Sequence, residues 1–327
     1  MKTFRVGVIG LGSMGQSHAR VLAGMDSVEK IICLDNDSER VWSGSKSVRV
    51  GSLSSLTQSV PDYVVVATPT KTHHELGLEL ASAGITALVE KPIAMNAEQA
   101  KELVLAFRDN STQAFTGFVE RFNGVNSLLK SLIAENRIGS PISIETERIG
   151  PNPKRITDVG VLLDLGSHDL DLIQWLFGKT VEDTRALTKL ASGHLADATT
   201  VSLSGLLDGT IPFQSLISWD SPLKSRKTRI LGTEGMLTSD SLVGSVSITT
   251  QSTSSSEWDG YLHQRGYHDS RQETVLVPQK EPLLGLHEAI QNVDNMGNFG
   301  ALCTLEEGQS HLGPLWQMLS QGGARPN

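Results

Sequence analysis

The sequence has 327 residues, about twice the usual length of a single domain, and therefore predicts two domains that each bury a core. Hydrophobic residues make up 39% and charged residues 20%, which excludes the low hydrophobicity and high charge of disordered chains. The formal net charge is -8 and no dense run of lysine or arginine occurs, which excludes a nucleic-acid-binding function.

The sequence contains no stretch with the roughly 18 uninterrupted apolar residues of a membrane helix, and the first apolar run, residues 6–11, is short for a signal peptide. We therefore expect a cytoplasmic protein with no membrane partner. Cys33 lies in an apolar strand pattern and Cys303 is far away along the chain. Both are expected as buried thiols, with no disulfide and no metal site.

The first 120 residues alternate between strand and helix patterns. Continuous apolar runs predict parallel strands at residues 4–9, 30–34, 63–67 and 85–90. Helices are expected at residues 14–23, at residues 73–83, and from a cap at Asn96 to about residue 108. This alternation predicts a doubly wound parallel sheet, a Rossmann fold, over residues 1–120.

Beyond residue 120 the pattern changes to one typical of an antiparallel sheet. Strands are expected at residues 142–148, 198–206, 210–219, 227–231 and 243–249. Helices are expected at residues 125–135, 163–177, 283–294 and 304–319, and loops at 150–153 and 252–256, the latter as a loop or hairpin tip. Residues 121–327 therefore form the predicted second α/β domain. The sequence leaves open whether the last helices of this domain pack back on the first domain.

The turn after the first strand has the pattern Gly10-x-Gly12-x-x-Gly15 and opens a helix. Glycines in this pattern allow a tight turn, a close approach of the backbone to a pyrophosphate, and close packing of helix and strand. We therefore predict a dinucleotide site that also includes Ser13 and Met14. The alternative is a glycine-rich turn without a ligand.

Asp35 ends the second strand twenty positions after Gly15, where the ribose-binding carboxylate of such sites belongs. A carboxylate there accepts hydrogen bonds from a 2′-hydroxyl and repels a 2′-phosphate. NAD is therefore the predicted cofactor and is favoured over NADP. The alternative is a solvated aspartate.

Two further segments lie at the carboxyl ends of parallel strands, the edge at which open α/β sheets bind ligands. Thr68, Pro69 and Thr70 are expected cofactor contacts, unless they form only a turn. His73 either faces the nucleotide or sits in the first turn of its helix.

Glu90-Lys91-Pro92 ends the fourth strand of this sheet. Its position predicts that Glu90 and Lys91 contact the cofactor, with the Lys91 ammonium beside the nicotinamide. The alternative is an ordinary solvated lysine.

The helix of the second domain begins with a run of titratable residues. Spacings of four and three place Asp164, His168 and Asp171 on one helix face. A neighbouring carboxylate orients an imidazole and raises its proton affinity, so His168 is a candidate general base. The alternative is a helix start with a local ion pair.

Taken together, four motifs resemble the Gfo/Idh/MocA family of NAD(P)-dependent sugar and cyclitol dehydrogenases. They are the glycine pattern, Glu90-Lys91-Pro92, Gly117-Phe118-x-x-Arg121-Phe122 and Asp164-x-Gly166-x-His168-x-x-Asp171. The resemblance implies an N-terminal Rossmann domain and a C-terminal α/β domain with an open, mostly antiparallel sheet. Because that sheet often serves assembly in the family, it also implies a homodimer or homotetramer.

The resemblance further implies that Lys91 and His168 flank the reacting carbon, with Asp164 as a supporting group. His168 would then take the hydroxyl proton while Lys91 stabilises negative charge on oxygen. The family's motif often has a cis bond before Pro92, which the sequence leaves open.

The segment from residue 147 to residue 161 is similar to a family branch assigned as UDP-N-acetylglucosamine 3-dehydrogenases. A nucleotide-sugar diphosphate requires local positive charge, which Arg148, Lys154 and Arg155 would supply unless they form only a basic surface loop. The remaining expected substrate contacts are Arg121, Asn123 and Asp171.

A UDP-sugar 3-dehydrogenase is therefore the predicted enzyme, with myo-inositol or a simple hexose as the alternative substrate. Two other classes stay open: a dinucleotide-binding sensor without catalysis, and a purely structural subunit. The presence of both Lys91 and His168 argues against the sensor.

Overall fold

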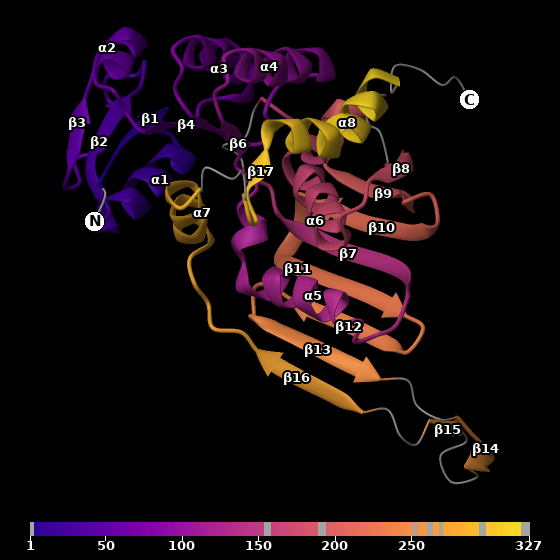
Figure 1. Cartoon of the computed structure of the whole chain (residues 1–327). Coiled ribbons are helices and arrows are strands. Elements are labelled where there is room, and N and C mark those ends of the chain that lie inside the picture. Colours follow the sequence, from indigo (N-terminus) through magenta and orange to yellow (C-terminus); the bar gives the residue numbers. More distant parts are fainter. Residues whose placement is uncertain are drawn as a thin grey trace.

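The chain forms two β-sheets with helices packed on them in the computed structural model (Figure 1). The structure describes residues 3–153, 158–188, 194–250, 254–259, 264–267, 271–293 and 299–321, with backbone only for the two short ranges between 254 and 267. No helix within these ranges is long and apolar enough to cross a membrane.

The N-terminal sheet has seven strands in the order β17-β6-β5-β4-β1-β2-β3, and its strands are parallel except β17. Its strands are β1 (Phe4–Ile9), β2 (Val28–Leu34), β3 (Ser47–Arg49), β4 (Tyr63–Val66), β5 (Ala87–Val89), β6 (Ala114–Thr116) and β17 (Cys303–Thr304). Its helices are α1 (Ser13–Gly24), α2 (Leu53–Gln58), α3 (His73–Ser82) and α4 (Ala97–Asp109). This is the doubly wound Rossmann arrangement that the sequence predicts.

Local chemistry explains why these elements form where they do. Every residue of β4 is buried, as its unbroken apolar pattern requires of a strand covered on both faces. The Asn96 side chain caps α4 by accepting a hydrogen bond from the N–H of Gln99, as predicted. Cys33 and Cys303 are both free and buried, which confirms the expectation for the two thiols.

The second sheet has eight strands in the order β16-β13-β12-β11-β7-β10-β9-β8, and neighbours run antiparallel except β7 and β10. Its strands are β7 (Pro141–Pro151), β8 (Val181–Leu187), β9 (Thr200–Leu207), β10 (Ile211–Ser218), β11 (Asp220–Gly232), β12 (Gly235–Asp240), β13 (Ser245–Thr250) and β16 (Gln272–Leu276). The helices α5 (Gly124–Ala134) and α6 (Ser167–Phe177) lie over one face of this sheet (Figure 1).

Several strands differ from the sequence prediction. β7 continues to Pro151, through part of the expected loop, because β10 and β11 pair with it on both sides. β8, β12 and β16 were not predicted, since their polar and small residues are held by pairing with neighbouring strands. Of the expected 252–256 loop, residues 252 and 253 lie outside the described residues, and Ser254 begins strand β14 (Ser254–Asp259), which pairs with β15 (Gln264–Tyr267).

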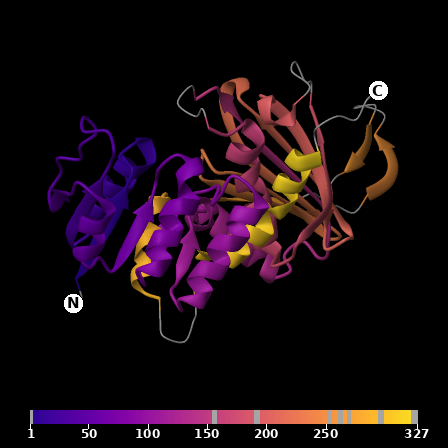
Figure 2. The ribbon, with the colours of Figure 1, turned by 90° about the horizontal axis from the view of Figure 1, so that it is seen from above.

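The end of the chain returns to the N-terminal sheet. Helix α7 (Pro282–Gln291) packs on α1, β17 pairs with β6, and α8 (Leu305–Gln321) lies along α4, as the view from above shows (Figure 2). The N-terminal sheet is therefore completed by residues nearly 190 positions downstream of β6. The boundary between residues 120 and 121 remains a proposal.

Candidate active site

The glycine loop between β1 and α1 has the geometry of a phosphate cradle. Gly10 has φ +88, and a Cβ there would lie 2.7 Å from the carbonyl oxygen of Ala67. A Cβ at Gly15 would lie 1.7 Å from the carbonyl oxygen of Gly10, so α1 packs here only with glycine. At Gly12 the space is open, the nearest atom being an Arg40 nitrogen at 3.9 Å, and no side chain caps the N-terminus of α1. The residues present therefore fit a bound pyrophosphate.

Asp35 lies at the end of β2 and is tied to this loop. Its Oδ2 accepts a hydrogen bond from the N–H of Leu11 at 2.6 Å, and its Oδ1 accepts one from the N–H of Asp37 at 2.8 Å. A carboxylate has further lone pairs, so these bonds leave room for a ribose hydroxyl. Besides its predicted role, Asp35 therefore fixes the shape of the loop.

The segment after β4 is joined to the second half of the chain. The N–H of Thr70 donates to Asp158 Oδ2 at 2.8 Å, and the Thr72 hydroxyl donates to Thr68 Oγ1 at 2.8 Å. Thr68 lies beside the glycine loop, since its methyl would lie 2.9 Å from a Cβ at Gly10, and the Pro69 carbonyl accepts a hydrogen bond from the Thr72 hydroxyl at 2.8 Å. Sequence reasoning did not identify Asp158 as a partner of this segment.

His73 is a brace between two loops. The ring is buried, with Nδ1 2.9 Å from the carbonyl oxygen of Pro92 and Nε2 2.9 Å from that of Thr68. Both ring nitrogens therefore face backbone oxygens, which leaves neither for a nucleotide. The expected cofactor contact is not seen; instead the side chain ties together the strand ends that carry Thr68 and Lys91.

Lys91 makes an ion pair that joins the end of β5 to the turn before α6. Its Nζ lies 2.7 Å from Asp164 Oδ1 and 3.0 Å from the Asp164 carbonyl oxygen, while Trp219 Nε1 donates to Asp164 Oδ2 at 3.3 Å. The Lys91 and Asp164 side chains are only 14% and 11% exposed. Lys91 is therefore not a solvated surface lysine. The bond between Lys91 and Pro92 is cis.

Asp164 lies in a π-helical turn, Leu162–Gly166, that leads directly into α6. Such turns insert an extra residue into a helix and are frequent at functional sites. Here Asp164 turns to Lys91, and Asp171 binds Arg121. Neither carboxylate makes a hydrogen bond or an ion pair with His168 among the described residues, so the predicted interaction of the three groups is wrong.

His168 is surrounded by positive charge rather than by carboxylates. Its Nδ1 is buried and has no hydrogen-bond partner within the described part of the chain. Burial, followed by the charges of Lys91, Arg148 and Arg226, lowers the pKa of His168 well below its usual value of 6.5. The expectation that a carboxylate raises its proton affinity is wrong, and the imidazole is neutral at pH 7.

Arg148 is enclosed in a network of its own. Its Nε lies 2.5 Å from Asp169 Oδ1 and its Nη1 2.8 Å from Glu120 Oε1, and the Arg148 side chain is 7% exposed. Two carboxylates thus neutralise this guanidinium. The geometry does not support its expected role in binding a substrate diphosphate.

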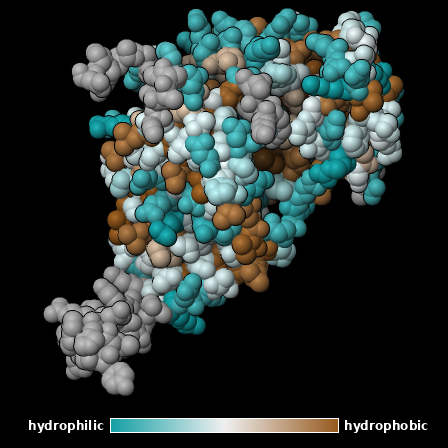
Figure 3. All heavy atoms as spheres, turned by 180° about the vertical axis from the view of Figure 1, so that it is seen from behind, coloured by the Kyte–Doolittle hydropathy of each residue, from teal (hydrophilic) through white to brown (hydrophobic). Residues whose placement is uncertain are grey.

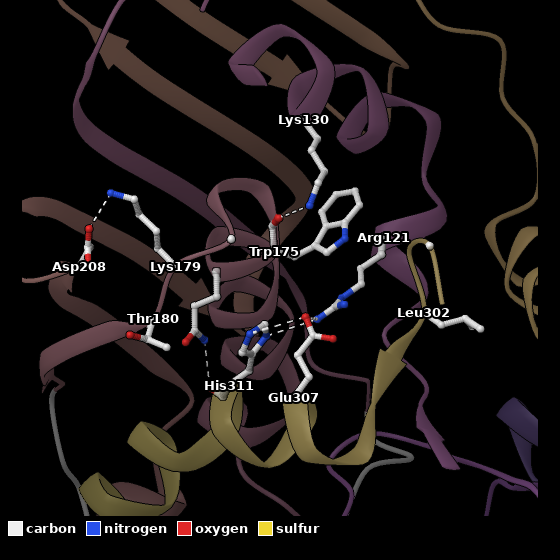
Figure 4. Close-up of a pocket in the computed structure, with 12 residues that line it drawn as sticks. Arg121, Lys130, Trp175, Lys179, Thr180, Asp208, Leu302, Glu307 and His311 are labelled. Carbon is white, nitrogen blue, oxygen red and sulfur yellow. Dashed lines mark hydrogen bonds and ion pairs between the residues drawn. The ribbon is translucent and has the colours of Figure 1, made fainter. Parts of the chain in front are cut away.

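Arg121 and Asp171 also pair with each other rather than with the Lys91 cluster. Arg121 Nη2 lies 2.5 Å from Asp171 Oδ1, and His311 Nδ1 lies 2.9 Å from the same oxygen. Arg121 and His311 border a hollow of about 500 Å³ whose lining includes Glu307 but neither Lys91 nor His168 (Figure 4). The Asn123 side chain caps α5 through the N–H of Val125. None of the three is brought to the predicted reaction centre.

Sequence reasoning proposed Lys154 and Arg155 for the substrate and overlooked Arg226. Lys154 and Arg155 lie outside the described residues. Arg226 of β11 was missed, because it precedes the expected strand. It donates to the carbonyl oxygens of Ile149 and Ser225 and, among the described residues, makes no ion pair with a carboxylate.

Comparison with known proteins agrees with this geometry. A model of an oxidoreductase family with an NAD-binding Rossmann fold, Gfo/Idh/MocA, matches residues 4–118, and a Gfo/Idh/MocA C-terminal domain matches residues 127–238. The UDP-N-acetylglucosamine 3-dehydrogenase of Acidithiobacillus ferrooxidans is 30% identical over 209 residues, 63% of this chain and 64% of that protein. Inositol 2-dehydrogenase 2 of Saccharopolyspora erythraea is 29% identical over 199 residues, 58% of this chain and 59% of that protein.

Each of these two alignments spans less than two thirds of the relative's length. Solved structures extend the likeness in fold over nearly the whole chain. The structure of UDP-N-acetylglucosamine 3-dehydrogenase GnnA from Acidithiobacillus ferrooxidans has a TM-score of 0.81 at 24% identity, covering 97% of this chain and 96% of that one. The WlbA dehydrogenase from Bordetella pertussis, solved with NADH and UDP-GlcNAcA, has a TM-score of 0.77 at 19% identity over all of both chains. This chain therefore belongs to the Gfo/Idh/MocA family of oxidoreductases and has that family's NAD-binding Rossmann fold.

Proposed function

We propose that this protein is an NAD-dependent dehydrogenase that oxidises a secondary hydroxyl of a UDP-sugar, with carbon 3 of UDP-N-acetylglucosamine as the first candidate. One observation carries the proposal: the Lys91 ammonium, held by Asp164, is one of the charges that, after burial, lower the pKa of the half-buried, neutral His168 imidazole in α6. A general base and an oxyanion-stabilising cation are thus close together at the carboxyl edge of the NAD-binding sheet.

The overall reaction converts an alcohol and NAD⁺ into a ketone, NADH and one proton. NAD supplies the hydride acceptor when it is bound over the glycine loop. His168 takes the hydroxyl proton on an unprotonated ring nitrogen, and the Lys91 ammonium stabilises the negative charge that develops on the substrate oxygen. Asp164 and Trp219 keep the Lys91 amine in place. Because the pKa of His168 is low, the captured proton passes readily to solvent.

The charges around His168 support an anionic substrate. Arg148 is already neutralised by two carboxylates, whereas Arg226 contributes a half-buried guanidinium that is anchored only to backbone oxygens among the described residues. We assign the substrate diphosphate to Arg226, together with Arg155 from the segment outside the described residues. The similarity to a UDP-N-acetylglucosamine 3-dehydrogenase supports this choice, while the similarity to an inositol 2-dehydrogenase keeps myo-inositol as the alternative.

The test follows NADH formation by the purified protein with a panel of UDP-sugars, hexoses and cyclitols. We expect turnover with UDP-N-acetylglucosamine, and His168→Ala to lower kcat by about 10²–10⁴-fold with NAD affinity unchanged. Arg226→Met raises KM for the UDP-sugar, whereas the matched variant Arg229→Met, at an exposed position of the same strand, does not. Oxidation of myo-inositol alone would reverse the substrate order.

A sensor remains the candidate from another class. It would show a thermal shift with NAD but no turnover on any member of the panel. Near-normal turnover by His168→Ala would remove this residue from the mechanism while leaving the dehydrogenase intact.

We also propose that the protein forms a homodimer or homotetramer through the uncovered face of the second sheet. That face carries partly exposed apolar residues, Leu216 at 39% and Leu231 at 41%, beside the ion pair of Glu145 and Arg229. Seen from behind, brown apolar side chains lie among polar ones on the molecular surface (Figure 3). Light scattering should give two or four times the chain mass, and Leu216→Lys should lower it.

A further inference from the structure

A line of buried polar side chains runs from Glu90, beside Lys91, into the N-terminal half of the molecule. His18 of α1 places Nε2 2.9 Å from Glu90 Oε1 and Nδ1 2.9 Å from Nε2 of His287. His287 comes from α7, 269 positions away, and its Nδ1 lies 3.0 Å from the Tyr63 hydroxyl. Both imidazoles are fully buried.

The line ends at the half-buried side chains of Gln291 and Ser27. Gln291 Nε2 donates to the Tyr63 hydroxyl at 3.4 Å, and the Ser27 hydroxyl donates to Gln291 Oε1 at 2.7 Å. The series therefore connects residues of α7 with His18 in the middle of α1 and with residues at the ends of β2, β4 and β5.

The donors and acceptors of this series fit only one direction when both imidazoles are neutral. A carboxylate only accepts, so His18 must donate to Glu90 from Nε2, which leaves its Nδ1 as an acceptor. His287 then donates from Nε2 and accepts the Tyr63 proton on Nδ1. Burial, and secondarily the neighbouring His18, lowers the pKa of His287 well below 6.5, in agreement with a neutral ring. Every group in the series is thereby satisfied without an added charge.

The Glu90 carboxylate is fixed on its other side by the active-site backbone. Its Oε2 accepts a hydrogen bond from the N–H of Lys91 at 3.3 Å. Its Oε1 occupies the space beside Gly117, where a Cβ would lie 2.7 Å from that oxygen. One carboxylate thus contacts both His18 and the residue whose amine reaches Asp164.

We propose that His18 and His287 are positioning residues: their one-directional hydrogen bonds hold the Glu90 carboxylate, and through it the backbone that carries Lys91. The consequence for turnover rests on the dehydrogenase function proposed above. Without the His18 donor, the buried Glu90 carboxylate keeps, among the described residues, only its long bond to the Lys91 N–H and must shift towards another donor or water. Displacing a reacting group by about 1 Å costs on the order of 10²-fold in rate.

The first test measures the tautomers of the two histidines and the position of Lys91 without any substrate. Nitrogen-15 NMR of the wild-type protein should show both rings neutral, each protonated on Nε2 and unprotonated on Nδ1. In His18→Leu the backbone amide signal of Lys91 should move. In His18→Gln it should return close to its wild-type position, because glutamine can donate to Glu90 and accept from His287.

The second test measures catalysis by the same variants. We expect His18→Leu to lower kcat at least about 10-fold with the Kd for NAD within about 3-fold of wild type, and His18→Gln to recover most of the loss. Tyr63→Phe, which removes the donor to His287, should lie between them. The control is His74→Leu, which removes a histidine paired with Glu102 between α3 and α4 and should leave kcat unchanged.

Three results would overturn the proposal. The first is an Nδ1-protonated tautomer of either ring, and the second is an unmoved Lys91 amide signal in His18→Leu. The third is a loss of kcat that is equal in His18→Leu and His18→Gln and parallels the loss of thermal stability in these variants. If the rings and the amide behave as expected but the wild-type protein oxidises no sugar or cyclitol, the proposed function fails while the positioning role stands.

Discussion

Replacing Arg148 with methionine distinguishes a structural guanidinium from a substrate-binding one. The change keeps most of the apolar stem but removes the positive charge between Asp169 and Glu120. Asp169 is then left buried with only the Thr146 hydroxyl, at 3.0 Å, among its side-chain donors in the described residues. Removing one partner of a buried ion pair costs about 3–5 kcal/mol. With an unfolding entropy of roughly 0.7 kcal/mol/K for a chain of this length, Tm should fall by about 6 °C.

The assay combines urea and thermal unfolding with steady-state kinetics. Arg229→Met is the matched control, since Arg229 pairs with Glu145 in a bridge whose two side chains are 56% and 54% exposed. An exposed pair contributes about 0–1 kcal/mol, so the control should unfold like the wild type. If Arg148→Met unfolds like the control but raises KM for a UDP-sugar 10-fold or more, the arginine binds substrate and our reasoning is refuted.

Three other predictions concern pH, the cofactor and the cation. Burial lowers the pKa of His73, His168 and His287. Below pH 6.5 these histidines therefore take up protons in the unfolded chain while they stay neutral in the folded protein. The free energy of unfolding should then drop by up to about 1.4 kcal/mol per pH unit for each histidine. A flat stability profile by urea unfolding from about pH 7 to pH 5.5 would contradict this. Asp35→Ala should raise the Kd for NAD, measured by calorimetry, about 10–100-fold, which is the loss of affinity expected for a charged hydrogen bond. The same change should weaken discrimination against NADP. Unchanged binding would exclude Asp35 from the ribose site. Lys91→Met should lower kcat about 10²–10³-fold while NAD still binds, and a variant that retains kcat would argue against the oxyanion role.

Much of the N-terminal sheet follows from local sequence. Unbroken apolar strands, the cap at Asn96 and the glycine spacing each act over a few residues, and the structure has them close to the predicted positions. The short β3 and helix α2 were missed, because three and six residues give no clear period. In the second sheet, β12 has only two large apolar residues, Met236 and Leu237, and becomes a strand through pairing with its two neighbours.

The charges around the candidate site were predicted less well than the fold. Helical spacing placed Asp164, His168 and Asp171 together, but the π-helical turn and more distant cations separate them. The pairing of carboxylates and cations depends on contacts across 21 to 73 positions, which periodicity does not contain. The same holds for His18 and His287, whose pairing no local pattern indicates.

The strand β17 has a consequence for synthesis of the protein. It pairs with β6 at the edge of the NAD-binding sheet, yet about 190 residues separate the two along the chain. At roughly 5–20 residues per second, a ribosome needs about 10 to 40 s to make that interval. During this time the nascent Rossmann half has an unpaired edge strand and lacks α7 and α8. A fragment that stops after β6 should therefore aggregate, and chaperones that shield strand edges should matter most until β17 has emerged.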